Sequence, residues 1–512
     1  MHPRIHAQSQ PDKLAVVMSS RGDQLTYAGL EQRANRAAHA LRALGINNGD
    51  TFALASDNRI EFFEIYWGAQ RAGATLVLLS SRLKLDEIAY IVGDSGAKLV
   101  LVSGNLPTTA ADLAQARALV PGVSALAAIG AVEGLPDWNA LCAAQPHTPI
   151  ADEQVGGRMV YSSGTTGRPK GLRFDGVGTL PVQTNPAAEL FGRLYGFGGD
   201  TVYLAPAPLY HSAPMGMTVC NQSLGGTVVL MPKFDPEEFL RAIERWQVTT
   251  VMVVPTMFIR LLALPEEVRT RYDLSSLQTV IHAAAPCPIP VKQAMIEWFG
   301  PIIDEFYAGS EGNGHVKITS QEWLERPGSV GRAVLGEIHI CDDEGNELPA
   351  GEIGTIYFGG GRPISYHNDP GKTASVHNPK HPGWSTLGDI GRVDDDGYLY
   401  LSDRKDFMII SGGVNIYPQE VENLLSAHPD VADVAVFGVP NAQFGEEVKA
   451  VVQPRDWGAA GESLGQALIA WCRERLADVK CPRTVEFQQE LPRAENGKLY
   501  KKELKAKYWP AA

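Results

Sequence analysis

One loop of this 512-residue chain is rich in groups that bind phosphate. Residues 161–171 read Tyr-Ser-Ser-Gly-Thr-Thr-Gly-Arg-Pro-Lys-Gly and follow a strand-like apolar run. Glycines let the backbone N–H groups approach an oxyanion, and hydroxyls and a cation add further donors. Gly/Ser/Thr clusters are also typical of plain surface loops. The Arg-Pro-Lys-Gly ending favours a phosphate cradle instead.

The loop departs from the standard P-loop, which ends in Gly-Lys-Ser/Thr and runs into a helix. Here Pro169, which has no N–H, stands in the glycine position, and Gly171 follows Lys170. The segment resembles the signature of the adenylate-forming superfamily, which includes acyl-CoA synthetases, adenylation domains of peptide synthetases and beetle luciferases. The resemblance implies that ATP is bound by Ser162, Ser163, Gly164, Thr165, Thr166, Gly167 and Lys170.

A second segment, Phe306-Tyr-Ala-Gly-Ser-Glu-Gly312, follows another strand-like run. It resembles the superfamily's Tyr-Gly-x-Thr-Glu motif, which implies that Tyr307 contacts adenine, Ser310 contacts phosphate and Glu311 binds Mg²⁺. A hydroxyl beside a carboxylate suits a hard cation. The same residues are one substitution from the nucleophile elbow of α/β-hydrolases. That alternative lacks sequence context for the other two members of a triad.

Two charged segments, Gly388-Asp-Ile-Gly391 and Asp403-Arg-Lys-Asp406, also resemble motifs of the superfamily. Taken alone, such short runs are usually surface charge. By resemblance, Asp389 and Arg404 bind ribose, Asp406 is the hinge about which a small domain turns, and Ser411, Gly412 and Gly413 meet coenzyme A.

The segment Pro492-Arg-Ala-Glu-Asn-Gly-Lys498 has a strong turn signal at Asn-Gly. A lone lysine on a turn is normally solvated, so the residues themselves assign it no role. The segment resembles the family's C-terminal catalytic loop, which implies that Lys498 bridges the substrate carboxylate and the α-phosphate.

Three stretches resemble the walls of substrate pockets. Ala283, Ala284, Ala285 and Pro286 are similar to a loop beside adenine. His211 lies in a segment that resembles the family motif with a catalytic or acyl-site histidine, although a lone histidine is more typical of a structural role. The acyl pocket is expected to combine His211, Met215, Met217, Met257, Phe258 and Ala283. These side chains suggest an apolar acid, and fatty, aryl and sterol-type acids remain open.

Composition narrows the class of protein. A net charge of −13 argues against a nucleic-acid partner, and no apolar run approaches the length of a membrane span. The six cysteines form no C-x-x-C pair, so neither a zinc site nor a disulfide framework is indicated and a cytoplasmic location is expected. A homodimer is possible because dimers are the commonest soluble oligomers.

Alternating strand and helix patterns predict an α/β fold with mostly parallel sheets over the first 400 residues. An N-cap pattern at Asp235-Pro-Glu-Glu predicts a helix that runs to about Trp246. Antiparallel patterns begin near Gly331 and last to about residue 402. We expect an N-terminal domain over 1–405 and a small, mobile α+β domain over 406–512.

The resemblance covers almost the whole chain and implies an AMP-forming acid–CoA ligase that uses ATP, Mg²⁺ and coenzyme A. The alternative is a stand-alone adenylation enzyme that loads a carrier-protein thiol. A luciferase-type oxygenase is not singled out by any residue. A non-enzymatic ATP-binding protein would be expected to lack Lys498 or Glu311, and both are present.

Overall fold

The computed structural model describes residues 2–20, 22–106, 110–113, 120, 122–162, 169–176, 186–493 and 499–509. The chain forms two compact units. The first comprises Met1–Val253, Leu264–Val280 and Ser365–Lys372, and the second comprises Val254–Ala263, Ile281–Ile364 and Thr373–Ala512. Strand β12 (Thr279–His282) and helix α14 (Pro370–Ser375) lie where the chain passes from one unit to the other.

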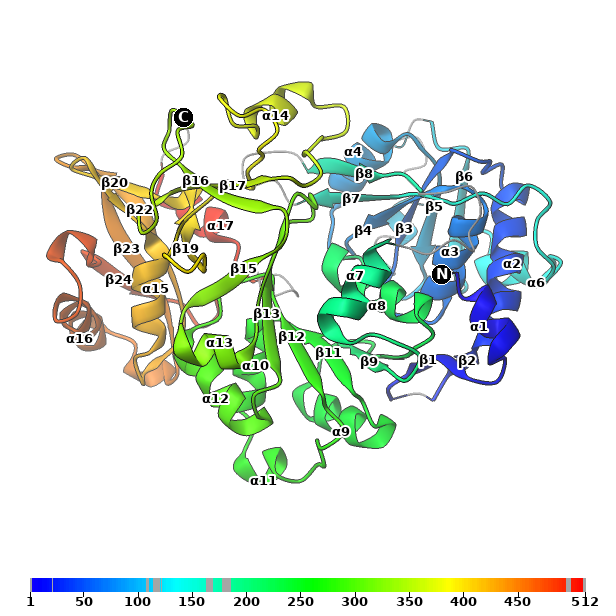
Figure 1. Ribbon diagram of the computed structural model, residues 1–512, viewed down its shortest axis with the longest axis horizontal. Helices are drawn as coiled ribbons and strands as arrows, with labels where there is room; N and C mark the ends of the chain where they lie inside the picture. Colours follow the sequence, from blue (N-terminus) through cyan, green and yellow to red (C-terminus); the bar gives the residue numbers. More distant parts are fainter. Residues whose placement is uncertain are drawn as a thin grey trace. The chain divides into compact units, whose positions relative to one another are not determined.

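The first unit contains a sheet with the strand order β6-β5-β3-β4-β7-β8 (Figure 1). All its pairs are parallel except the last, β7 with β8. The strands are β3 (Thr51–Ala55), β4 (Thr75–Leu79), β5 (Ala97–Ser103), β6 (Ala125–Ile129), β7 (Arg158–Ser162) and β8 (Lys170–Phe174). Their apolar runs are buried because helices cover a parallel sheet on both faces.

A second series of strands in the first unit runs β9-β10-β1-β2, and β11 pairs with β9. Only the β1–β2 pair is antiparallel. These strands are β1 (Leu14–Met18), β2 (Gln24–Thr26), β9 (Val202–Ala205), β10 (Thr227–Leu230) and β11 (Thr250–Val253). The helices are α1 (Arg4–Ser9), α2 (Tyr27–Ala43), α3 (Glu61–Arg71), α4 (Leu85–Ser95), α6 (Trp138–Ala143), α7 (Pro186–Tyr195), α8 (Ser212–Ser223), α9 (Pro236–Trp246) and α11 (Glu266–Arg269).

The second unit begins with an antiparallel series, β13-β14-β15-β19-β18-β17-β16. Its core contains Val316, Ile356, Phe358 and Leu399. The strands are β13 (Ile303–Tyr307), β14 (His315–Ile318), β15 (Ser329–Leu335), β16 (Glu337–Cys341), β17 (Gly354–Gly359), β18 (Asp389–Val393) and β19 (Leu399–Arg404). Helices α10 (Pro255–Leu262), α12 (Ile289–Phe299) and α13 (Ser320–Glu325) belong to the same unit.

The C-terminal part of the second unit has its own sheet, in the order β21-β20-β23-β22, with β24 parallel to β23 (Figure 1). A separate core lies between this sheet and helices α15 and α16. The elements are η2 (Lys405–Phe407), β20 (Ile409–Ser411), β21 (Val414–Ile416), α15 (Pro418–Ser426), β22 (Val431–Asn441), β23 (Gly445–Pro454), η3 (Trp457–Ala459), α16 (Glu462–Arg473), η4 (Asp478–Lys480), β24 (Thr484–Phe487) and α17 (Lys501–Ala506).

The predicted α/β class is confirmed. Helix α9 begins as its cap pattern predicts, because the Asp235 side chain accepts a hydrogen bond from the Glu238 N–H and Pro236 is the first helical residue. The antiparallel series of the second unit starts at β13–β14, earlier than the expected position near Gly331. The boundary at residues 405/406 stays a prediction.

Candidate active site

The two ends of the phosphate loop are held together by strand pairing in the first unit. Strands β7 and β8 are antiparallel, with Ser162 opposite Lys170 and Tyr161 opposite Gly171. A Cβ on Gly171 would lie 2.5 Å from Met159 Cε and 3.1 Å from Tyr161 Cζ, so a side chain there would collide with the strand pair. The loop residues 163–168, which include most of the expected ATP ligands, lie outside the described residues.

Lys170 is the first residue of β8, at the mouth of this loop. Its ammonium group lies 5.5 Å from the ring centroid of Tyr366, a distance that permits a cation–π contact. The backbone N–H of His367 donates to the Gly171 carbonyl at 2.8 Å. The segment at 366–367 therefore packs against the start of β8 and stabilises the position of Lys170.

Tyr307, Asp389 and Arg404 form a polar cluster in the second unit. Asp389 begins β18, Arg404 ends β19, and the two residues face each other in the antiparallel register. The Tyr307 hydroxyl donates to Asp389 Oδ2 at 2.7 Å, and Arg404 Nε lies 3.1 Å from Asp389 Oδ1. Three residues from separate strands thus meet at one carboxylate, and their contacts with ribose and adenine stay predictions.

The electrostatics of this cluster favour a protonated phenol at Tyr307 and a charged guanidinium at Arg404. Burial, and then the Asp389 carboxylate, hold the pKa of Tyr307 well above its usual value. Burial alone would lower the pKa of Arg404, but the charge of Asp389 and of other neighbours outweighs it and raises the pKa. A carboxylate held in this way can accept hydrogen bonds from ribose hydroxyls, and the guanidinium can donate to them.

Glu311 lies in the turn after β13, close to this cluster. Its charge contributes to the raised pKa of both Tyr307 and Arg404. A Cβ on Gly309 would lie 2.7 Å from Glu311 Oε2, so the missing side chain leaves room for the carboxylate. Leu387 Cδ2 would lie closer still, at 2.5 Å, so a side chain at 309 would have to displace both Leu387 and Glu311.

The donor set around Glu311 fits Mg²⁺. Among the described residues no group of three or more His, Cys, Asp or Glu side chains could hold a metal by itself. Mg²⁺ differs from most metals in that it is commonly held by one or two carboxylates together with substrate phosphates and water. The single carboxylate of Glu311, with the Ser310 hydroxyl beside it in sequence, satisfies that requirement.

The expected adenine loop begins where β12 ends at His282. Ala283 is buried, and Ala284 has a φ of 76°. This is the left-handed region, which a non-glycine residue rarely adopts and which costs about 1–3 kcal/mol of strain. Strain of this kind gathers at binding sites, so the conformation of Ala284 agrees with a loop shaped for a ligand.

His211 is the N-cap residue of α8, and its ring lies 4.4 Å from that of Tyr210. Asn58 fixes the backbone that leads to these residues. The Asn58 amide donates to the carbonyls of Ala207 at 3.0 Å and Met231 at 2.9 Å, and its oxygen accepts from the Leu209 N–H at 2.9 Å. The sequence analysis did not single out Asn58, although a polar residue just after the buried strand β3 was a usable signal.

Apart from the half-buried His211, the predicted acyl-pocket residues are buried, and they divide between the two units. Met215 and Met217 lie on α8 in the first unit, and Met257 and Phe258 lie on α10 in the second. The pocket that they would form together stays a prediction.

Asp406, the predicted hinge, lies in the short helix η2. Ser411, Gly412 and Gly413 form the end of the β20–β21 hairpin, where Ser411 pairs with Val414. Both glycines have positive φ values, 58° and 82°, as a two-residue hairpin turn requires. The predicted coenzyme A contact is therefore a tight turn with little side-chain bulk.

Lys498 lies within residues 494–498, outside the described residues, so its position stays a prediction. The residues on either side of this segment are tied together. The Tyr500 N–H donates to the Pro492 carbonyl at 2.8 Å, and Arg493 forms an antiparallel bridge with Leu499.

Two ion pairs anchor the base of the same segment. Arg493 makes a bidentate contact with Asp433, at 2.6 and 2.7 Å. Lys501 Nζ lies 2.8 Å from Glu422 Oε1, and both side chains are buried. Sequence analysis missed both pairs, because the partners lie on other elements of the C-terminal sheet and helices.

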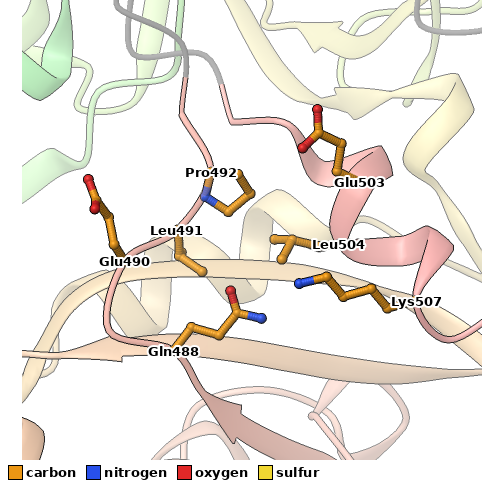
Figure 2. Close-up of a pocket in the computed structure, with 7 residues that line it drawn as sticks. All are labelled: Gln488, Glu490, Leu491, Pro492, Glu503, Leu504 and Lys507. Carbon is orange, nitrogen blue, oxygen red and sulfur yellow. The ribbon is translucent and has the colours of Figure 1, made fainter.

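A cavity of about 350 Å³ lies beside this base (Figure 2). The segment from Gln488 to Pro492 forms one wall, and Glu503 and Leu504 of α17 form the other together with Lys507, the C-cap residue of that helix. None of the predicted site residues lines it.

Comparison with known proteins agrees with the geometry. The chain matches the AMP-binding enzyme family over residues 4–363 and the AMP-binding enzyme C-terminal domain over residues 420–498. It is 35% identical to feruloyl-CoA synthase from Amycolatopsis sp, over 96% of each chain. It is 31% identical to the long-chain-fatty-acid–CoA ligase FadD13 of Mycobacterium tuberculosis, over 99% of this chain and 97% of that one.

Solved structures give the same result. ATP-bound MatB from Rhodopseudomonas palustris superposes with a TM-score of 0.84 at 28% identity, over 99% of each chain. The o-succinylbenzoate CoA synthetase MenE of Bacillus subtilis, in complex with its acyl-adenylate OSB-AMP, superposes with a TM-score of 0.81 at 26% identity over 98% of this chain and 97% of that one. The chain therefore belongs to the AMP-binding enzyme family.

Proposed function

We propose that the chain couples a carboxylic acid to coenzyme A in two steps at one site. The chain is an AMP-forming acid–thiol ligase with ATP and coenzyme A as substrates, as its family membership and CoA-ligase relatives indicate. The observation that carries the proposal for this site is the Tyr307–Asp389–Arg404 cluster beside Glu311. It provides one carboxylate and one guanidinium for a ribose next to a carboxylate for a phosphate-bound cation.

In the first step a carboxylate oxygen of the acid attacks the α-phosphorus of ATP. A new P–O bond forms, the bond to the bridging oxygen breaks, and pyrophosphate leaves with its electron pair. The protein positions the reactants and stabilises charge rather than forming covalent bonds. When bound, Mg²⁺ supplies positive charge to the phosphate oxygens.

We assign the work of this step to groups contributed by separate segments. Lys170 and the loop 162–167 hold phosphate, Asp389 and Arg404 hold the ribose, and Lys498 bridges the acid and the α-phosphate. Tyr307 and the loop from Ala283 to Pro286 hold the adenine.

In the second step the thiol sulfur attacks the acyl carbonyl carbon and AMP leaves, while the thiol proton is lost. We propose that the small domain, residues 406–512, turns about Asp406 between the steps. This rotation would withdraw Lys498 and present the turn at Gly412 and Gly413, whose lack of side chains leaves room for the pantetheine arm.

The acid that we propose is apolar. Met215, Met217, Met257 and Phe258, the expected wall residues, offer no charged group to a substrate. The compounds named for the relatives range from feruloyl-CoA to long-chain fatty acids, so both aryl and fatty acids fit this description.

We also propose a cytoplasmic location and a homodimer. All six cysteines are free, which fits a reducing compartment. No helix among the described residues is both long and apolar enough to span a bilayer. Size-exclusion chromatography with light scattering would test the dimer.

The function is tested by pyrophosphate release from ATP with a long-chain fatty acid, a hydroxycinnamic acid and a sterol-type acid, each with and without coenzyme A. We expect acid-dependent pyrophosphate release and, with coenzyme A, stoichiometric AMP and thioester. One relative is named fatty acid–[acyl-carrier-protein] ligase, so the assay includes a carrier protein with its pantetheine thiol. Thioester formed on the carrier but not on coenzyme A would contradict the proposal.

Lys498→Ala tests the assignment of the catalytic lysine. A cation that stabilises developing charge contributes about 10²–10³ in rate, so acyl-adenylate formation should fall by that factor. Thiolysis of a preformed adenylate should continue. The matched control is Lys502→Ala, which removes an exposed lysine four residues away. Unimpaired pyrophosphate release in Lys498→Ala would refute the assignment.

A further inference from the structure

Three buried ionisable groups of the second unit converge behind the expected adenine loop. His282 is the last residue of β12, Lys292 lies in the first turn of α12, and Glu305 is the third residue of β13. Lys292 Nζ lies 2.5 Å from Glu305 Oε2, and His282 Nε2 lies 3.4 Å from the same oxygen. Glu305 therefore pairs with Lys292, four residues beyond the loop 283–288, while the His282 ring on the other side of the loop lies near the same oxygen without a hydrogen bond among the described residues.

The cluster is closed off from water. The side chains of His282 and Lys292 are fully buried and that of Glu305 nearly so. The Trp323 ring centroid lies 4.9 Å from Lys292 Nζ, and the Phe258 ring packs edge-on against His282 at 5.4 Å. Burial, followed by the Lys292 charge, lowers the pKa of His282 well below its usual value, so the imidazole is neutral near pH 7.

A buried ion pair of this kind is weak evidence for stability. Removing two charges from water costs about as much as their attraction returns, and well-packed apolar residues often serve the fold equally well. What the pair does fix is geometry, because a carboxylate and an ammonium at 2.5 Å admit little displacement. The pair therefore fixes the position of the loop that carries Ala283–Pro286 relative to the strand that carries Tyr307.

Glu305 and Tyr307 are two residues apart on β13, so their side chains leave the same face of the strand. A shift of Glu305 relative to His282 and Lys292 would change the spacing between the adenine loop and Tyr307. The strained Ala284, with its φ of 76°, lies inside the loop 283–288.

We propose that Glu305 is a positioning residue: through Lys292 it ties the start of α12, and with it the loop 283–288, to β13 and thereby sets the width of the nucleobase site. The inference rests on the proposed function, since it assumes that this loop and Tyr307 enclose adenine. It predicts that nucleobase selection depends on the Lys292–Glu305 pair, although neither side chain is accessible to the nucleotide.

Two variants test the proposal. Glu305→Gln keeps the shape but leaves Lys292 without its counter-charge. The double variant Glu305→Met with Lys292→Met replaces the pair by apolar side chains of similar length, which should preserve the fold. Thermal unfolding, KM for ATP, KM for the acid and the ratio of kcat/KM for ATP to that for GTP are measured for each.

We expect the double variant to unfold within a few degrees of the unmodified protein. Its KM for ATP should rise at least fivefold, its preference for ATP over GTP should fall by a similar factor, and its KM for the acid should stay within twofold. The matched control is Asp304→Asn with Lys317→Met, which removes the ion pair of 2.8 Å made by the neighbouring residue of β13. The control should leave the ATP/GTP ratio unchanged.

A stable double variant with unchanged KM for ATP and unchanged ATP/GTP ratio would overturn the proposal, because the pair would then only fill the core. A double variant that does not fold would also overturn it, because the pair would then be a determinant of stability. Failure of the proposed function looks different, since the unmodified protein itself would release no pyrophosphate with any acid. ATP and GTP affinities of the same variants, measured by calorimetry, would still test the site width in that case.

Discussion

The hydroxyl group of Tyr307 offers a sharp test of the ribose site. Tyr307→Phe keeps the aromatic ring, and with it any contact with adenine, but removes the donor that lies 2.7 Å from Asp389 Oδ2. If the ring alone matters, the variant should be silent. If the hydroxyl orients the carboxylate that receives the ribose, ATP should bind and react less well.

The magnitude follows from the contacts of Asp389. A hydrogen bond to a charged group contributes about 1.5–3 kcal/mol, and each 1.36 kcal/mol corresponds to about tenfold in rate. The expected loss of kcat/KM for ATP therefore lies between about 10-fold and about 150-fold. Arg404 remains 3.1 Å from the other oxygen of Asp389 and keeps that carboxylate in place. We therefore expect a loss near the lower limit, about tenfold.

The assay is pyrophosphate release with ATP varied at saturating acid, followed by the reverse titration. KM for the acid should be unaffected. Tyr357→Phe, which removes a half-buried phenol hydroxyl from β17 of the same antiparallel sheet, serves as the control. A change of less than about twofold in kcat/KM for ATP would refute the reasoning, because it would show that the hydroxyl does not orient the carboxylate.

Three further substitutions have defined outcomes. Lys501→Met should destabilise the protein by about 3–5 kcal/mol in urea titration, since it leaves the buried Glu422 carboxylate without a counter-charge and with only the Val436 N–H as donor among the described residues. Burial raises the pKa of Glu422, so the folded state binds the proton more tightly than the unfolded state does. The free energy of unfolding of this variant should therefore fall as pH rises. If Lys501→Met lowers the free energy of unfolding by less than about 1 kcal/mol, the prediction is contradicted. Gly309→Ala should raise the Mg²⁺ concentration needed for half-maximal activity, because the added Cβ would lie 2.5 Å from Leu387 Cδ2 and 2.7 Å from Glu311 Oε2 and would displace both side chains; an unchanged requirement would contradict the expectation that moving this carboxylate weakens cation binding. Asn58→Ala should raise KM for the acid and leave KM for ATP unchanged, since it releases the backbone before His211; equal effects on both would argue against a local role.

Much of the fold and of the motif chemistry could be predicted from local sequence. The cap at Asp235 has its physical cause within a few residues, and the structure places it as expected. The turn at Gly412 and Gly413 also has a local cause, although no hairpin was predicted there. The pairing of Asp389 with Arg404 does not follow from the hairpin alone, because a register shift between Ile390 and Gly391 separates this pair from the turn. Local sequence is therefore sufficient to predict the structure where a single helix cap or hairpin turn defines it.

Long-range partners could not be predicted in this way. Asn58 contacts Ala207 and Met231, which are 149 and 173 residues away. Glu305 reads in the sequence as one polar residue in a strand, and nothing local shows that it faces Lys292 and His282. Periodicity tells which face of an element is buried but not which side chain of another element meets it.

The ribose contact and the expected hinge lie almost next to each other in the chain. Arg404 ends β19, and Asp406 follows two residues later in η2. A rotation at Asp406 would change backbone dihedrals within two residues of a group that holds the nucleotide. Binding and rotation are then thermodynamically linked, and the linkage is reciprocal. If one orientation of the small domain binds the nucleotide more tightly than the other, ATP, and later AMP, shifts the equilibrium between the two orientations by the same factor.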